Sequence, residues 1–450
     1  MARSTGRVPG RIPGTAAERV VVVLERLLGA PVPVRVRAWD GSTAGPDEDG
    51  PVLVVTSRRA VRRLLWQPDE LGLGRAWVAG EVDVEGNLEE LLRRLAGVDR
   101  DLTRRRTLTP QERSELVRAS VLLGAVGPQP KAPPEEASLV GDAHTRGRDA
   151  SVARHHQAAG ADFFSLVLGE SLAYSVAALE PGGPADLAEA QALAHDRTCD
   201  VLDLRKGDRL LDLGCGWGSL VVHAAVHRGA RTVGLTLSRE QAEVARKRAA
   251  EAGVADRVEI RVQGWREVDD GPNDADVAAD AAGLVGSGTW PDLAARVHEL
   301  LPMGGRLLVE QVVRRPGRRR PGGAFTDAYV LPDRALPTLA ELVDAVEVAD
   351  LEVRLLRSLR EQYARTVRQW AASLAAHRGR AEAVAGTGRV RAWEVFLAGS
   401  AVAADTGALG VAQLLAVRRH ADGRAGPPSV RTVPRPHPAG VAETDHQEGQ

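Results

Sequence analysis

The sequence has few of the features that mark secreted, nucleic-acid-binding or membrane-spanning proteins. Only two cysteines occur among 450 residues, Cys199 and Cys215, which is too few for a disulfide framework and suits a reducing cytoplasm. The formal net charge is −1, so no overall positive field attracts nucleic acid. No apolar run approaches the roughly 18 residues of a membrane span. The basic N-terminus lacks a long apolar segment and a small-residue cleavage site, so we expect no signal peptide and only peripheral membrane contact.

The composition is that of a soluble globular protein with more than one domain. Hydrophobic residues make up 44% and charged residues 26% of the chain, and its length suits two or three domains of about 150 residues each. Proline and glycine cluster between residues 124 and 148, which is typical of a linker. We therefore expect a flexible tail at 1–15, a small α+β domain at 16–123, the linker at 124–148, a larger domain at 149–419 and a disordered tail at 420–450.

The small domain shows mixed periodicity. Helical spacing predicts helices at 16–28 and 88–95, and alternation predicts strands at 32–38 and 52–55. The stretch from Gly80 to Gly86 alternates apolar and acidic residues, as a half-buried strand does. No set of residues in this domain suggests catalysis.

The larger domain alternates short apolar runs with amphipathic segments. Strands are predicted at 209–213, 232–235, 258–262, 274–281 and 306–313, the fourth being weak because it is rich in alanine. Helices are predicted at 219–226, 239–252 and 291–301. This alternation predicts an α/β fold with a doubly wound, mostly parallel sheet, of the Rossmann-like type.

A glycine-rich turn follows the first of these strands and carries the strongest functional signal. It reads Asp212-Leu213-Gly214-Cys215-Gly216-Trp217-Gly218, and glycine allows both a positive φ and a close approach of the backbone to a ligand. A dinucleotide site would read G-x-G-x-x-G, with an acid after the second strand, whereas this chain has Gly234-Leu235-Thr236-Leu237-Ser238 there. The turn also lacks the Lys-Ser/Thr pair of a phosphate-binding loop, which argues against a nucleoside triphosphate. The turn favours S-adenosylmethionine (SAM); the alternative is a turn that only packs strand against helix.

Beyond the turn, several motifs resemble the cyclopropane-fatty-acyl-phospholipid synthase family, which includes the mycolic-acid methyltransferases. Early motifs are His156-Gln157-Ala158, Asp162-Phe163-Phe164 and Tyr174-Ser175-Val176. Later ones are Gly234 to Gln241, Gly264-Trp265, Tyr329-Val330-Leu331-Pro332, and Tyr363 with Trp370. The close of the sequence, from Arg389-Val390-Arg391-Ala392-Trp393 to Gly410-Val411, looks most like the actinobacterial branch that methylates fatty-acyl chains at C10.

The resemblance implies a class I SAM methyltransferase with helical insertions that form a lipid pocket. It implies that Tyr174 and Ser175 contact the methionine end of the cofactor, and that Trp265 flanks the adenine. The implied cofactor-binding residues are Tyr174, Ser175, Asp212, Gly214, Gly216, Gly218, Thr236, Leu237, Gln241, Gly264 and Trp265.

The chain departs from the family pattern in the catalytic half. The family carries Glu-x-Val-Gly after strand four, where this chain has Ala281-Ala282-Gly283-Leu284-Val285-Gly286. The family's Cys after Tyr-Ser is Val176, its His on strand five is Glu310, and the Tyr-Asp of its first motif is Gln157-Ala158.

These losses concern the step that follows methyl transfer. Methylation of an alkene leaves a carbocation that must lose a proton, and the family positions bicarbonate or a carboxylate to accept it. A positioned base contributes about 10²–10⁴-fold in rate. Glu310 is our first candidate, Glu170 a weaker one, and Tyr363 could face the cation with its ring. The alternatives are a solvent-facing Glu310 and a core Tyr363.

The remaining features leave two functions open. No His, Cys or Asp cluster has metal-ligand spacing, and we expect His155 and His156 to be structural or surface residues. The basic run from Arg314 to Arg320 would be a solvated loop or would meet lipid phosphates. We expect either an enzyme that acts on an unsaturated phospholipid acyl chain at a membrane surface, or a catalytically silent SAM-binding partner subunit. A methyltransferase with another substrate is the third option. The resemblance implies a homodimer, and the product, cyclopropane or methylene, stays open.

Overall fold

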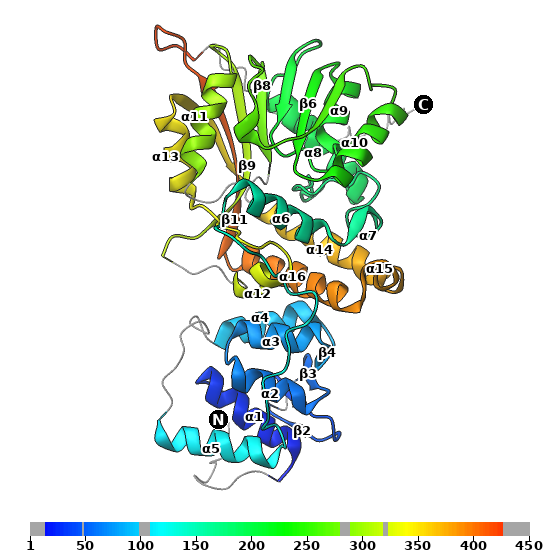
Figure 1. The fold of residues 1–450 in the computed structure, drawn as a ribbon, viewed down its shortest axis with the longest axis vertical. Helices are drawn as coiled ribbons and strands as arrows, with labels where there is room; N and C mark the ends of the chain where they lie inside the picture. Colours follow the sequence, from blue (N-terminus) through cyan, green and yellow to red (C-terminus); the bar gives the residue numbers. More distant parts are fainter. Residues whose placement is uncertain (1–13, 47–48, 99–108, 280–288, 318–322, 426–450) are drawn as a thin grey trace, which may run out of the picture.

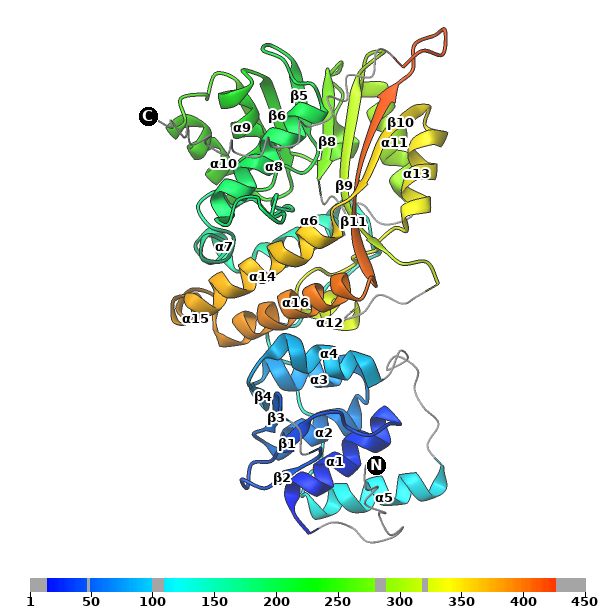
Figure 2. The same ribbon diagram turned by 180° about the vertical axis from the view of Figure 1, so that it is seen from behind.

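The chain folds into two sheets that lie toward opposite ends of an elongated molecule, with a layer of helices between them (Figures 1 and 2). The computed structural model describes residues 14–46, 49–98, 109–279, 289–317 and 323–425. A four-stranded sheet has the order β2-β1-β3-β4, and a seven-stranded sheet has the order β10-β11-β9-β8-β5-β6-β7. Most of each predicted tail, 1–15 and 420–450, falls outside the described residues.

The small N-terminal unit contains the helices and strands predicted for it. Helix α1 (Ala16–Leu28) begins at a capping box in which Thr15 and Glu18 satisfy each other's backbone N–H groups. The predicted half-buried strand is β4 (Val82–Glu85), and the helix after it is α4 (Leu88–Val98). The other elements of the unit are β1 (Arg35–Arg37), β2 (Thr43–Ala44), β3 (Val52–Val55), α2 (Arg58–Trp66), α3 (Glu70–Val78) and α5 (Pro110–Leu122).

The segment after this unit is a packed connection. Residues 124–145 are all described and form no helix or strand. Glu136 is nevertheless ion-paired with Arg75 of α3 at 2.6 Å and accepts a hydrogen bond from the Tyr329 hydroxyl at 2.9 Å. The backbone N–H of Ala137 donates to the carbonyl of Ala328 at 2.7 Å. The connection therefore joins the small unit to the larger domain through several fixed contacts.

The five strands predicted for the larger domain all form and run parallel. They are β5 (Arg209–Asp212), β6 (Arg231–Thr236), β7 (Val258–Val262), β8 (Ala275–Ala279) and β9 (Arg306–Arg314). The predicted helices are α9 (Ser219–His227), α10 (Arg239–Glu251) and α11 (Trp290–Leu300). Helices α8 (Leu187–Val201) and α13 (Leu339–Val348) and the short η1 (Trp265–Glu267) complete this layer. The doubly wound α/β fold is thus confirmed.

Two further strands close the sheet on its β9 side. Strand β11 (Leu409–Arg418) inserts between β9 and β10 (Leu351–Ser358) and is antiparallel to both. The side chains of β11 are buried along almost its whole length, because the strand is covered on both faces. This pairing sets a row of residues from three strands side by side near the functional site.

Helices cap the carboxyl ends of the parallel strands. They are α6 (Arg146–Gln157), α7 (Gly160–Leu168), α12 (Gly323–Tyr329), α14 (Arg360–Ala376), α15 (Arg378–Ala385) and α16 (Thr387–Asp405). Their core is aromatic: Phe163, Phe164, Trp217, Trp370 and Trp393 are all buried. Among the described residues, no helix has both the length and the apolar character that crossing a membrane requires.

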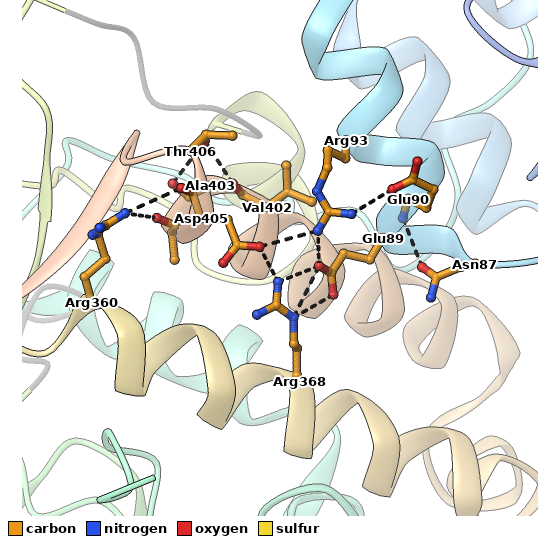
Figure 3. A network of polar contacts seen from close by, with 11 residues as sticks. Asn87, Glu89, Glu90, Arg93, Arg360, Arg368, Val402, Ala403, Asp405 and Thr406 are labelled. Atoms are coloured by element: carbon orange, nitrogen blue, oxygen red, sulfur yellow. Dashed lines mark hydrogen bonds and ion pairs between the residues drawn. The ribbon is translucent and has the colours of Figure 1, made fainter. Parts of the chain in front are cut away.

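The small unit is fastened to this helical layer by a reciprocal contact. The indole N–H of Trp77 donates to the carbonyl of Arg391 at 2.9 Å, and the buried Arg391 guanidinium donates to the carbonyls of Trp77 and Val82 at 2.7 and 2.6 Å. That guanidinium also lies 4.3 Å from the centre of the Trp77 ring. Figure 3 shows a second link, in which Arg368 of α14 contacts Glu89 of α4 and Asp405 of α16.

Candidate active site

A cavity of about 170 Å³ opens at the carboxyl ends of β5, β6, β8 and β9, under the helical cap. Parallel α/β sheets bind ligands at this edge. Its lining includes eight of the predicted cofactor residues and one predicted catalytic residue: Tyr174, Ser175, Asp212, Gly214, Gly216, Thr236, Leu237, Gln241 and Glu310. Residues far apart in the sequence thus meet at one site.

The glycine turn after β5 needs glycine for both conformation and space. Gly216 and Gly218 have φ values of 50° and 83°, in the left-handed region that favours glycine. A Cβ on Gly218 would lie 2.7 Å from the Cβ of Ala245 on α10. Gly218 is not among the described residues that line the cavity, so its role is to let α9 start against α10. Gly214 and Gly216 present their backbone to the cavity itself.

Asp212, at the end of β5, is a fully enclosed acid beside this turn. One of its oxygens accepts a hydrogen bond from the Gly214 N–H at 3.1 Å. Burial raises the pKa of its carboxyl from 3.8 to about 7, since desolvation disfavours the charged form. A positively charged group bound in the cavity would stabilise the carboxylate.

The end of β6 presents an oriented amide to the cavity. The Thr236 hydroxyl donates to Oε1 of Gln241 at 2.7 Å, which turns the Gln241 Nε2 toward the glycine turn. A Cβ placed on Gly216 would lie 3.9 Å from that nitrogen. Leu237 also lines the cavity and contacts Gly264, whereas Gly264 and Trp265 are not among the described lining residues. Trp265 is packed in the core below, with Arg266 over its ring at 4.3 Å.

The segment of residues 171–176, called here the Tyr174 segment, forms another wall. Tyr174 stacks on Trp370 with ring centres 5.3 Å apart. The buried Gln191 of α8 donates to the carbonyls of Leu168 and Ala173 at 2.9 and 3.3 Å, and it accepts from the Ser171 hydroxyl at 2.6 Å. These bonds fix the segment that carries Tyr174 and Ser175 against the cavity.

Glu310 points from β9 into the same cavity. Its Oε1 accepts a hydrogen bond from the Val176 N–H at 3.2 Å, and its Oε2 accepts one from Nε2 of Gln413 at 3.1 Å. The other two predicted catalytic residues lie elsewhere: Glu170 is exposed, and Tyr363 is buried in the aromatic cluster. Neither is among the described lining residues. Glu310 itself is half-buried and faces the cavity, so the alternative of a solvent-facing Glu310 is wrong.

Three basic residues line the cavity although the sequence did not identify them as site residues: His156, His195 and Arg334. Burial lowers the pKa of His156 to about 4 and that of His195 to about 3, so both imidazoles are neutral. His156 Nδ1 is bonded to the carbonyl of Val330 at 3.0 Å. Within the described part of the chain, no group of His, Cys, Asp or Glu side chains could hold a metal ion.

Comparison with known proteins identifies the family. The profile of the mycolic acid cyclopropane synthetase family matches residues 144–414. The chain belongs to this family. It is 33% identical over 392 residues to "Probable fatty acid methyltransferase Rv3720" of Mycobacterium tuberculosis, which covers 86% of this chain and 91% of that protein. It is 30% identical to the tuberculostearic acid methyltransferase UfaA1 of the same organism, covering 92% and 95%.

A solved member of the mycolic acid cyclopropane synthetase family has the same fold in its catalytic domain. The mycolic acid cyclopropane synthase CmaA1, crystallised with SAH and CTAB, aligns with a TM-score of 0.56 at 27% identity. The alignment covers 59% of this chain and 97% of that one. The predicted cofactor, SAM, is thereby confirmed. The residues of this chain fit it: a glycine backbone for close approach, an oriented Gln241 amide, and the Asp212 acid for a cationic ligand.

Membership of the mycolic acid cyclopropane synthetase family makes the departures of this chain informative. The stretch 281–286, where the family's acidic motif is missing, lies outside the described residues. Glu310 is half-buried, lines the cavity, and carries a hydrogen-bond donor on each oxygen. A carboxylate held in this way can accept a proton from a group bound in the cavity.

Proposed function

We propose that this chain transfers a methyl group from SAM to the double bond of an unsaturated fatty-acyl chain of a phospholipid, and that Glu310 accepts the proton released afterwards. One observation carries the proposal. The carboxylate of Glu310 faces the same cavity as Asp212, Gly214 and Gly216, and the Val176 N–H fixes it there at 3.2 Å. The names of the relatives, a fatty acid methyltransferase and a tuberculostearic acid methyltransferase, support a fatty-acyl substrate.

The proposed chemistry needs one electrophile and one base. Bound SAM would supply the methyl group, its S–CH3 bond breaking as the new C–C bond forms, which leaves S-adenosylhomocysteine and a carbocation on the acyl chain. Glu310 then takes a proton from the cation, and the C–H electron pair closes a cyclopropane ring or forms a methylene double bond. The proton passes from the Glu310 carboxyl to solvent before the next turnover. A positioned base of this kind contributes about 10²–10⁴-fold in rate.

The walls beside Glu310 suit an apolar chain. Phe164, Trp217 and Leu331 line the cavity together with the stacked Tyr174. Aromatic faces stabilise a nearby cation by about 0.5–2 kcal/mol and exclude the water that would otherwise trap it. We expect the acyl chain to enter past these side chains.

The lipid substrate implies contact with a membrane surface, and we propose that the protein binds there peripherally, from the cytoplasm, as a homodimer. The basic run beyond β9 is one candidate for that contact. Arg314 is bonded to Glu341 at 3.1 Å, whereas Arg318, Arg319 and Arg320 lie outside the described residues. Basic clusters gain about 1 kcal/mol per charge near an anionic lipid surface.

A second candidate function is that of a SAM-binding partner subunit without activity. It is favoured by the sequence 281–286, which lacks the acid that the family carries. Expression in a host rich in oleoyl phospholipid, followed by mass analysis of the fatty acids, separates the two. If the chain is an active enzyme, the host should contain a fatty acid heavier by one methylene. This product should be absent with Glu310→Ala and still present with Glu170→Ala. Soluble SAM-binding protein that yields no new fatty acid would favour the silent subunit.

A further inference from the structure

Glu310 is the first member of a row of three polar side chains that crosses three neighbouring strands. Glu310 of β9 is paired with Gln413 of β11, and Gln413 is paired with Arg357 of β10. Directly paired residues of antiparallel strands point to the same face of the sheet, with Cβ atoms about 5 Å apart. A carboxylate, an amide and a guanidinium therefore follow one another from the cavity toward the edge strand.

Gln413 contacts Glu310 from behind the cavity. Its side chain is 5% exposed, and it is not among the described lining residues. Its Nε2 donates to Oε2 of Glu310 at 3.1 Å, while the Val176 N–H donates to Oε1. Each carboxylate oxygen thus has a donor that fixes its direction. An amide N–H cannot lose its proton at physiological pH, so this donor is present at every working pH.

Arg357 adds a positive charge behind Gln413. Its side chain is half-buried, and its Nε has no hydrogen-bond partner among the described atoms. Burial and the nearby positive charge of Arg197 lower the pKa of the guanidinium, while the charges of Glu310 and Glu180 favour its charged form. Arginine stays protonated in proteins. A buried cation without a full set of hydrogen bonds is costly, and the carboxylate two strands away is one of its compensating charges.

We infer that Gln413 and Arg357 are positioning residues that keep Glu310 ionised and aimed into the cavity. The inference deepens the proposed function, on which it rests for the step that Glu310 carries out. It gives a role to two polar side chains, the buried Gln413 and the half-buried Arg357, neither of which is among the described residues that line the cavity.

The need for such support follows from the other charges that face Glu310. Asp212, His156, His195 and Arg334 line the same cavity from β5, α6, α8 and the loop after α12. The two histidines are neutral, and an ionised Asp212 would oppose a second negative charge nearby. Among the described residues, Asp212 accepts from the Gly214 N–H, whereas Glu310 accepts from both Val176 and Gln413 and has the Arg357 charge behind them. The surroundings thus favour the charged form of Glu310 more strongly than that of Asp212.

The test measures the ionisation of Glu310 directly and then its effect on turnover. Full-length protein labelled with carboxyl-¹³C glutamate is titrated by NMR, and the Glu310 signal is assigned by its loss in Glu310→Gln. Gln413→Met removes the donor and keeps the length of the side chain, and Arg357→Met removes the charge. Arg354→Met, on the same strand and outside the row, is the matched control; its partner is Glu352 at 2.7 Å.

We expect the Glu310 titration midpoint to rise by about one pH unit in Gln413→Met, since hydrogen bonds to a charged group favour that form. A smaller rise is expected in Arg357→Met and none in Arg354→Met. The acid limb of the kcat profile on oleoyl phospholipid vesicles should move by the same amount, because the base must be ionised to act, with KM for SAM unchanged. Midpoints that do not move, or a kcat that falls by one factor at every pH, would overturn the inference.

Two outcomes separate this inference from the proposed function. Titration needs no turnover, so shifted midpoints in a protein that methylates no lipid would support the positioning role and refute the enzyme. If the wild type methylates lipid but the Gln413→Met and Arg357→Met variants keep the wild-type Glu310 midpoint, the proposed function is supported and the positioning role is refuted. Binding of SAH by calorimetry reports folding of each variant, and Arg357→Met carries the test alone if Gln413→Met does not bind.

Discussion

Oε1 of Glu310 accepts a hydrogen bond from the backbone N–H of Val176, 134 positions earlier in the chain, at 3.2 Å. This bond joins the last of the five parallel strands to the segment that carries Tyr174 and Ser175, both of which line the cofactor cavity. The carboxylate is therefore fixed relative to the cofactor walls by the backbone itself, a contact that side-chain substitution at position 176 would leave in place.

Gly218 of the glycine turn and Gly253 have similar backbone conformations, but replacing them with alanine should lower the unfolding free energy by different amounts. Gly218 and Gly253 have φ values of 83° and 69°, but only Gly218 has a neighbour, Ala245, where a Cβ would stand. Gly253→Ala should cost about 1–2 kcal/mol of unfolding free energy for the left-handed conformation alone. Gly218→Ala should cost a further 1–3 kcal/mol, roughly, because the new Cβ would lie 2.7 Å from the Cβ of the buried Ala245, which has no flexible side chain that could move away. Urea denaturation checks both, and equal losses would contradict this account of the turn.

The Thr236–Gln241 hydrogen bond predicts an effect on cofactor affinity. Thr236→Val keeps the shape of the side chain but releases the Gln241 amide, so SAH should bind about fivefold to tenfold more weakly, by calorimetry. Thr232→Val on the same strand is the control, because its hydroxyl bonds to the carbonyl of Val221 away from the cavity. Comparable losses of affinity in both variants would show that the amide orientation does not matter.

The burial of Asp212 predicts a pH dependence of stability. Its pKa is raised from 3.8 to about 7, so between these values the folded protein holds a proton that the unfolded chain has released. Stability of the ligand-free protein therefore falls as pH rises through this window. Asp212→Asn removes this slope, so its stability relative to wild type should grow from pH 4 to about pH 7.5 and then level off. His156 and His195 contribute the opposite slope equally to both proteins, so a difference that stays constant with pH would contradict the burial argument.

Two contacts between the small unit and the helical cap are expected to contribute unequally to the stability of the folded protein. Arg391→Met leaves the carbonyls of Trp77 and Val82 without their donors and removes the ring contact, so we expect a loss of about 2–5 kcal/mol. Arg368→Met breaks the network of Figure 3, but its side chain is 38% exposed, and such ion pairs contribute only about 0–1 kcal/mol each. In thermal melting, Arg391→Met should lower the melting temperature more than Arg368→Met does. The reverse ranking would show that the ion-pair network of Figure 3 contributes more to stability than the Arg391 contacts.

The parallel half of the sheet could be predicted because its signals are local. Strands β5 to β9 alternate with helices at short spacing, and each strand is an apolar run that ends near a turn residue. Neither β10 nor β11 is among the predicted strands, and because α14, α15 and α16 separate the two in the chain, no local pattern indicates that they pair. Their register, which sets Gln413 between Glu310 and Arg357, is a non-local property that no periodicity contains.

The candidate site could also be predicted only in part. Glu310 follows from its place near the carboxyl end of a parallel strand, where such sheets gather their functional groups. Glu170 is close to Tyr174 in sequence, but it follows Gly169 at a φ of 81° and ends exposed. His195 and Arg334 face the cavity only because α8 and the loop after α12 pack over it, a tertiary effect without a local signal.

The most direct test of the account uses purified protein, vesicles of dioleoyl phospholipid and SAM with a trideuterated methyl group. Wild type should give a fatty acid that keeps two of the three deuterons, because one leaves the transferred carbon with Glu310 as its acceptor. Glu310→Gln should bind SAH with wild-type affinity and give product about 10²-fold more slowly or less. Equal rates from the two proteins would contradict the account.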